Sequence, residues 1–297
     1  MKIRHLLASI VVAAIAFGGS AGHAQYPLRQ YLSIRAALGP TISPDGKQVA
    51  FRSSITGTSQ LWKVGEKDKW PEQLTFFSSP INNAFWSPDG SSILVIVDKD
   101  GNEQFQFYLV KPDGLSVKPL TENPKVRYNW GGWSSNGKQI FFSSNLRNPE
   151  FFDCYVMDID TKSEKRVFTG DGSYYPGALS HDGKTMAVVK SMSNTDSDLI
   201  IVDVETGSTR TVSKPKAEVN YSPVGFTSDD KSLILRTDEG REFVNLASMN
   251  LASLKATFIG DEPHDIDIAT MSNNGRYLAY KLGQEAFDDI YALPLFG

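Results

Sequence analysis

The chain has 297 residues, of which 40% are hydrophobic and 22% charged, and its formal net charge at pH 7 is −4. This composition is typical of a globular protein and excludes a disordered chain. The negative net charge argues against a nucleic-acid partner, which would need a basic face. The length allows one large domain or two ordinary ones.

The first 24 residues have the pattern of a secretory signal peptide. Lys2 and Arg4 give a positive start, Leu6–Phe17 is a short apolar run, and Gly22-His23-Ala24 has small residues where a signal peptidase cleaves. Twelve apolar residues are too few to cross a bilayer. We expect residues 1–24 to be removed, residues 25–297 to form the mature domain, and the protein to be exported (periplasmic or secreted) without a membrane span.

A four-residue turn pattern recurs six times in the rest of the chain. It reads Ser-Pro-Asp-Gly at 43–46 and 87–90, and degenerate copies begin at Ser134, Ser180, Thr227 and Ser272. Asp or Asn in such a turn bonds its own backbone, and Gly supplies a positive φ. The copies are 44 to 47 residues apart, a period that is typical of radial or stacked repeats.

Each repeat carries short β-type runs around the turn. The second repeat has them at 84–86, 93–97, 107–110 and 118–121. No amphipathic helical pattern follows residue 35. Four antiparallel strands per repeat are typical of a propeller blade. The sequence therefore predicts an all-β fold, a β-propeller of four-stranded antiparallel blades with six repeat units, as a six-bladed ring or an incomplete seven-bladed ring.

The sixth repeat ends after its third strand, at Asp289–Leu293. Tyr26–Ser33 precedes the first blade and is a candidate for the missing fourth strand, which would close a six-bladed ring. Otherwise the ring stays incomplete, with unpaired sheet edges that favour aggregation.

The only cysteine, Cys154, takes a third-strand position at which sister repeats have Leu61 or Phe107. We expect a buried, inert thiol.

The blades resemble the TolB-like propeller repeat. More closely, the mature chain resembles the N-terminal propeller of secreted prolyl oligopeptidase family serine peptidases. The segments that carry the resemblance are Tyr31–Arg35, Gly39-Pro40, Gly57–Trp62, Gln73–Phe77, Asp100–Glu103, Gly131–Ser134, Ser143–Asn145, Phe152–Asp158 and Thr237-Asp238.

In that family the propeller caps an α/β-hydrolase domain and filters access to its Ser-Asp-His triad. The hydrolase domain normally follows the propeller, and the family usually has a seventh blade. We expect both to be missing from this chain.

Catalytic and metal-binding patterns are weak in the mature chain. The one Gly-x-Ser-x-Gly match, at 18–22, lies in the expected signal peptide. Only His181 and His264 remain as candidate bases, and we interpret them as a solvent-facing turn residue and a surface-loop residue. Zinc-ligand spacings are absent, and Asp98–Asn102 is interpreted as a plain turn because a calcium loop needs a later bidentate Glu. We therefore assign no catalytic residue, no metal and no cofactor.

One constellation remains, near the start of the first strand of each repeat. Counting five residues back from each turn gives Leu38, Asn82, Asn129, Tyr175, Ser222 and Asp267. Adjacent aromatic residues are Trp130, Tyr174 and Tyr221. Because first strands line the central channel of a propeller, we predict a binding site at a channel mouth made by Asn82, Asn129, Trp130, Tyr174, Tyr175 and Asp267. The alternative is that these polar groups are simply hydrated in a water-filled funnel.

These observations leave two main hypotheses for function. The first is a secreted, non-catalytic module that binds peptides or an envelope protein. The second is the substrate-gating propeller of a prolyl oligopeptidase family serine peptidase whose hydrolase domain is missing or separately encoded. A third, hydrolysis by residues 25–297 themselves, is the least favoured because only Asp267 brings a carboxylate to the channel.

Overall fold

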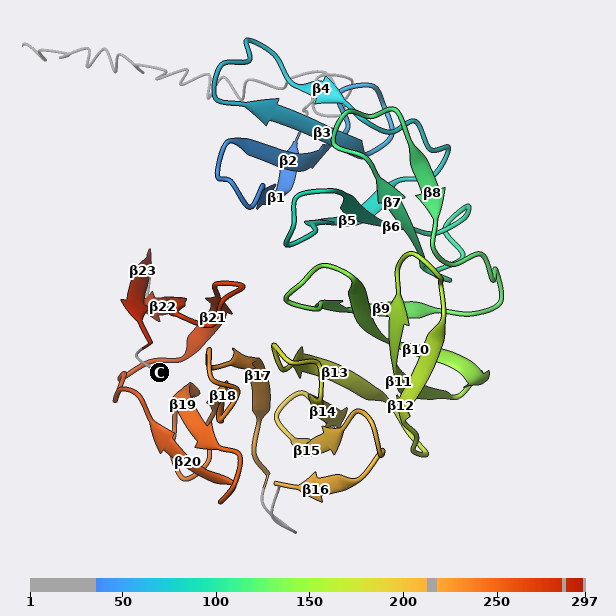
Figure 1. Ribbon diagram of the computed structural model, residues 1–297. Helices are drawn as coiled ribbons and strands as arrows, with labels where there is room; N and C mark the ends of the chain where they lie inside the picture. The colour runs from blue at the N-terminus through green and yellow to red at the C-terminus, as the bar shows by residue number, and fades with distance from the viewer. Residues whose placement is uncertain (1–35, 213–217, 285–286, 296–297) are drawn as a thin grey trace, which may run out of the picture. The chain divides into compact units, whose positions relative to one another are not determined.

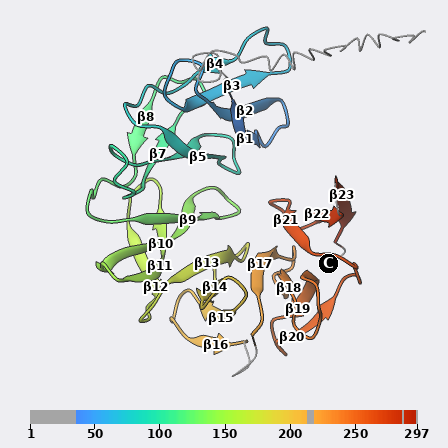
Figure 2. The same ribbon diagram turned by 180° about the vertical axis from the view of Figure 1, so that it is seen from behind.

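The computed structural model describes residues 36–212, 218–284 and 287–295. In this part of the chain every regular element is a β-strand (Figure 1). The strands form six antiparallel sheets that follow one another in chain order, and the view from behind shows the same succession (Figure 2). The fold is a six-bladed β-propeller, as the six repeated turns predict. The expected signal peptide (1–24) and the candidate closing strand (Tyr26–Ser33) lie outside the described residues.

Each blade begins with an inner strand. The inner strands are β1 (Ala37–Ile42), β5 (Ile81–Trp86), β9 (Tyr128–Trp133), β13 (Tyr174–Leu179), β17 (Tyr221–Phe226) and β21 (Ile266–Met271). The second strands are β2 (Gln48–Ser53), β6 (Ile93–Val97), β10 (Gln139–Asn148), β14 (Thr185–Ser191), β18 (Ser232–Thr237) and β22 (Tyr277–Gln284).

The outer strands complete the sheets. The third strands are β3 (Gln60–Gly65), β7 (Gln106–Val110), β11 (Phe151–Asp158), β15 (Ser197–Asp203), β19 (Asn245–Asn250) and β23 (Phe287–Pro294). The fourth strands are β4 (Glu72–Gln73), β8 (Val117–Pro119), β12 (Glu164–Phe168), β16 (Thr209–Thr211) and β20 (Lys255–Phe258). Five sheets thus have four strands, and the sixth has three among the described residues.

The repeated turns owe their shape to their own side chains. In the first turn, Ser43 Oγ donates to Asp45 Oδ1 at 2.6 Å, and the backbone N–H of Lys47 donates to the same oxygen at 3.1 Å. The N–H of Gln48 donates to Ser43 Oγ at 2.9 Å, and Gly46 has φ +73°. In the other five turns the Ser or Thr hydroxyl likewise donates to a side-chain oxygen of the Asp or Asn, at 2.6 to 2.9 Å. Each turn therefore fixes the hairpin between the first two strands of its blade.

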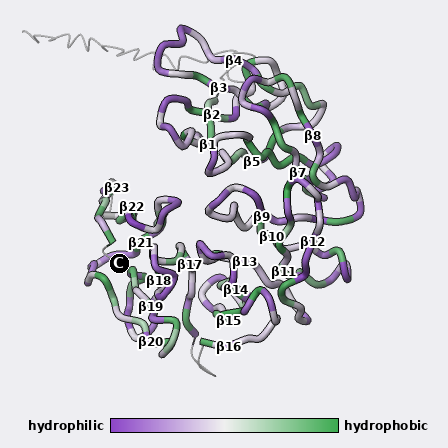
Figure 3. Tube along the Cα trace, in the orientation of Figure 1, coloured by the Kyte–Doolittle hydropathy of each residue, from purple (hydrophilic) through white to green (hydrophobic). Residues whose placement is uncertain are grey.

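The core lies between consecutive blades rather than at the centre of the ring. Five clusters of buried side chains each join one blade to the next, from blades 1 and 2 to blades 5 and 6. Hydrophobic colour follows β5 and β7 in Figure 3, because their side chains face neighbouring blades on both sides of the sheet. Cys154 belongs to the cluster of blades 3 and 4 and is fully buried, so the prediction of a buried thiol is confirmed. Burial raises the pKa of this thiol well above its ordinary value.

Inner strands approach one another closely where they lack side chains. A Cβ atom placed on Gly177 of β13 would lie 2.8 Å from Cγ of Pro223 in β17. Each of the six inner strands also has an irregular register with the second strand of its blade, at the start of β5 and β21 and further along in the other four, which bends the strand.

Candidate functional site

The six positions counted back from the turns are equivalent in the structure. Each is the second residue of its inner strand, on β1, β5, β9, β13, β17 and β21. We call this set the mouth ring: Leu38, Asn82, Asn129, Tyr175, Ser222 and Asp267. It lies at the end of the inner strands opposite the repeated turns, about 16 Å away at ~3.3 Å per residue.

The two asparagines of the mouth ring are partly exposed and hydrogen-bonded. Asn82 Nδ2 donates to Asp98 Oδ1 at 3.3 Å. Asn129 accepts from Arg127 Nε at 3.0 Å and donates to Ser143 Oγ at 3.3 Å. These bonds fix the orientation of both amides.

The aromatic residues divide into an exposed group and a buried group. Tyr175 is 37% exposed, and its ring stacks at 6.3 Å on Phe152 of β11. Tyr174 is only 8% exposed and packs 4.8 Å from Phe168. Trp130 stacks on Phe85 at 5.0 Å, between blades 2 and 3. Tyr175 is therefore the aromatic surface at the mouth, while Tyr174 and Trp130 pack against other rings between the blades.

The polar side of the mouth ring lies on blades 5 and 6. Asp267 is exposed and pairs with Lys281 Nζ at 3.1 Å. Arg236 donates to Ser222 Oγ at 2.9 Å, to the carbonyl of Ile266 at 2.9 Å and to the carbonyl of Asp267. The arginine thereby ties β18 to the next inner strand.

Arg52 on blade 1 differs from Arg236. It is paired in register with Leu38, and its Nε is buried without a hydrogen-bond partner among the described residues. Burial lowers the pKa of this guanidinium.

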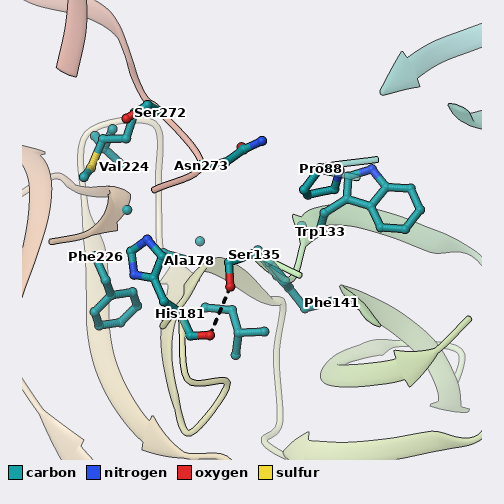
Figure 4. A pocket seen from close by; sticks show the side chains of 15 residues that line it. Pro88, Trp133, Ser135, Phe141, Ala178, His181, Val224, Phe226, Ser272 and Asn273 are labelled. Atoms are coloured by element: carbon teal, nitrogen blue, oxygen red, sulfur yellow. Dashed lines mark hydrogen bonds between the residues drawn. The ribbon is translucent and has the colours of Figure 1, made fainter. Parts of the chain in front are cut away.

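A second feature lies at the other end of the inner strands, beside the repeated turns. Residues of blades 2 to 6 enclose a space of about 180 Å³, which we call the turn-end pocket (Figure 4). Its walls combine apolar side chains of the inner strands with turn residues, among them Trp133, Ser135, His181, Phe226 and Asn273.

His181 is held firmly at the wall of the turn-end pocket. Its Nδ1 lies 2.7 Å from Asp230 Oδ1, and its backbone N–H donates to the same oxygen at 2.9 Å. The N–H of Asp182 donates to Asp230 Oδ2 at 3.0 Å. The interpretation of His181 as a turn residue is confirmed, but its side chain is only 24% exposed.

Asp230 was missed by reasoning from the sequence, although the sequence contains a signal for it. It stands at the fourth turn position, where the other five turns have glycine, and it has φ +54°. A non-glycine residue in this conformation is uncommon and deserves a reason. Here the reason is the link between the turns of blades 4 and 5.

The His–Asp pair does not extend to a serine nucleophile. Ser135 Oγ donates at 3.0 Å to the backbone carbonyl of His181, not to its ring (Figure 4). A triad requires a hydroxyl at the other ring nitrogen. In the described ranges no group of His, Cys, Asp and Glu has the geometry of a metal site, and no helix there is long and apolar enough to span a membrane.

The blades and their turns define a β-propeller, and comparison with known proteins places it among peptidase propellers. Residues 48–197, about half of the chain, match the family described as "Dipeptidyl peptidase IV (DPP IV) N-terminal region". The chain belongs to this family, the propeller region of prolyl oligopeptidase family peptidases.

Similar proteins agree with this assignment. The chain is 25% identical over 224 residues to Dipeptidyl aminopeptidase BIII of Pseudoxanthomonas mexicana, covering 73% of this chain and 32% of that protein. A solved structure of a prolyl endopeptidase has a TM-score of 0.67 at 12% identity, covering 91% of this chain and 44% of the other. A putative TolB from Agrobacterium tumefaciens has a TM-score of 0.57 at 20% identity, covering 89% and 91%.

The chain is similar to only part of each curated relative. The chain spans between about a third and a half of the length of the curated relatives it matches. The two structural likenesses concern the fold.

Proposed function

We propose that this propeller binds peptides at the mouth ring and admits them to a serine peptidase domain of the prolyl oligopeptidase type. The observation that carries the proposal is Tyr175, an exposed aromatic ring on an inner strand that is stacked on Phe152. Aromatic faces backed by the core bind peptide side chains at little entropic cost. Arg52, which pairs in register with Leu38, adds a positive charge near the mouth ring that favours a peptide carboxylate. Family membership supports the link to a peptidase.

Titration calorimetry of residues 25–297 with a panel of unstructured octapeptides tests peptide binding. We expect Tyr175→Ala to weaken binding about fivefold, since a stacked ring contributes on the order of 1 kcal/mol. Trp70→Ala is the matched control, because Trp70 is 70% exposed but lies outside the inner strands. Equal losses in both variants, or a panel without any binder, would count against the proposal.

The peptidase partner is tested separately by reading the coding sequence that follows Gly297. The proposal expects a Gly-x-Ser-x-Gly segment followed by an Asp and a His, in the same or an adjacent reading frame. A stop codon with unrelated sequence after it would favour the second candidate.

The second candidate is a non-catalytic propeller that binds peptides or an envelope protein as a separate chain. It is supported by the likeness to a putative TolB, which extends over 91% of that chain. Both candidates include export, which we propose from residues 1–24. N-terminal sequencing of the protein recovered from an exporting host tests this, and a mature chain starting at Gln25 is expected.

A further inference from the structure

We propose that the turn-end pocket holds one small apolar residue of a peptide together with a neighbouring backbone amide. The inference deepens the proposed function, on which it rests for the identity of the ligand as a peptide. It concerns the end of the inner strands opposite the mouth ring.

The size of the pocket limits the occupant. A space of about 180 Å³ is below the roughly 300–1,000 Å³ of sites that enclose a whole small molecule. It is room for about six waters at ~30 Å³ each. One residue of a longer ligand matches this size.

The walls determine which kind of residue fits. Phe141, Leu179, Phe226 and Met271 supply apolar surface. No Lys, Arg, Asp or Glu side chain is among the lining residues. A charged group would lose hydration there without an opposite charge to compensate. The pocket therefore favours an uncharged, apolar side chain.

Polar atoms of the wall complement a peptide amide. Trp133 Nε1–H is buried and has no hydrogen-bond partner among the described residues, and it gains one only if the ring turns towards a ligand carbonyl. Asp230 Oδ1, an acceptor, faces His181 Nδ1, so in the neutral ring Nδ1 carries the proton and Nε2 is left as an acceptor. A backbone amide offers the matching pair, a carbonyl and an N–H.

The polar groups are held in place before any ligand arrives. Asp230 fixes the His181 ring, and Ser135 Oγ holds the His181 carbonyl at 3.0 Å. Figure 4 shows Asn273 extending from the sixth turn towards Pro88 and Trp133 on the other side of the space. Its amide supplies a further donor and acceptor. Such preorganisation lowers the ordering cost of binding.

The test uses N-acetyl N-methylamides of alanine, valine and proline as probes, and those of lysine and aspartate as charged comparisons. Binding to residues 25–297 is followed by NMR of the backbone amide signals, which report on every variant, and of the five tryptophan indole N–H signals. We expect the Trp133 indole signal to shift in a saturable way with the apolar probes. The affinity for the charged probes should be at least fivefold lower.

Two variants borrow residues from sister repeats, which keeps the fold intact. Trp133→Phe installs the residue that Phe226 provides at the same strand position, and Asn273→Pro installs the turn residue of Pro44 and Pro88. Each is expected to weaken the apolar probes at least fivefold. Trp86→Phe is the control: Trp86 Nε1 is also buried and unpartnered, but Trp86 does not line this pocket.

The outcomes separate this inference from the proposed function. An unmoved Trp133 signal, or equal effects of Trp133→Phe and Trp86→Phe, would overturn the pocket assignment. If the pocket assignment fails but octapeptides still bind in a way that depends on Tyr175, the proposed function stands without the pocket assignment. Saturable probe binding by a chain that binds no octapeptide would support the pocket assignment and would refute peptide binding at the mouth ring.

Discussion

Asp230 shows how a single residue can connect two blades. Its backbone has the left-handed conformation that glycine adopts in the equivalent turns, which costs an aspartate some conformational energy. In return its carboxylate accepts from two backbone N–H groups and faces the His181 ring. Hydrogen bonds to a charged acceptor contribute about 1.5–3 kcal/mol each, more than the backbone cost.

Asp230→Gly should therefore destabilise the propeller, by about 2 kcal/mol, although it installs the consensus residue of the turn. Urea unfolding followed by tryptophan fluorescence measures the change. Asp230→Asn keeps one oxygen for His181 and tolerates the same φ, so its loss should be smaller. A glycine variant as stable as the parent would show that the carboxylate bonds contribute nothing net.

At the scale of the element, the repeated turn was almost fully predictable. The Asp or Asn side chain, the positive φ of glycine and the hairpin between the first two strands follow from local sequence alone. The short fourth strands were less predictable at their ends: the run expected at 118–121 is a strand only at Val117–Pro119, and the fourth strand of the first blade is only Glu72–Gln73. Beyond these ends, Leu74 and Leu120 turn into the core between blades, which local propensity does not encode.

The turn carboxylates should make stability depend on acid pH. The Ser43 hydroxyl and the Lys47 N–H lower the pKa of Asp45 from its ordinary value near 3.8. The pKa values of Asp182 and Asp229 are lowered in the same way. The largest cause is a hydrogen bond from a backbone N–H group, and the next is the hydrogen bond from the Ser180 or Thr227 hydroxyl. Since the unfolded chain binds protons first, this stabilisation is complete above about pH 5 and is lost as the pH falls through the lower folded-state pKa values.

Replacing the three carboxylates with Asn, which already serves in the turns of blades 3 and 6, should flatten this dependence. The measurement is the Tm between about pH 6 and pH 2.5, for the parent protein and for the triple variant Asp45→Asn, Asp182→Asn, Asp229→Asn. The parent should lose more of its Tm on acidification than the variant. Parallel curves would mean that other groups dominate acid unfolding.

At the scale of the whole molecule, the period of the turns predicted the number and order of the blades. The same period predicted that the mouth ring residues are equivalent, and all six are second residues of inner strands. It could not predict which of them are exposed. Tyr174 and Tyr175 are adjacent and chemically alike, yet the strand's alternation buries one between blades and exposes the other. The turn-end pocket escaped prediction because its walls come from five blades, through contacts that are remote in sequence.

Close packing between blades makes one further prediction. Gly177→Ala should cost about 1–3 kcal/mol because the new methyl group would overlap Pro223. Pro223→Ala removes the obstructing ring, so the double variant should recover part of the loss in a urea-unfolding cycle. Additive effects would show that the glycine is needed for a reason other than contact with Pro223.

The link between the turns of blades 4 and 5 also limits how the repeats can change over evolutionary time. A turn that is held only by its own side chains can change in sequence, or be exchanged between blades, without a matching change in the neighbouring turn. The pair formed by His181 and Asp230 lacks that independence. Substituting Asp230 leaves the His181 ring and two backbone N–H groups without their acceptor, and substituting His181 removes the ring from the Asp230 carboxylate. Among descendants of a common ancestor, these two positions should therefore covary, and a chimera that inherits only one of them should fold less stably than one that inherits both.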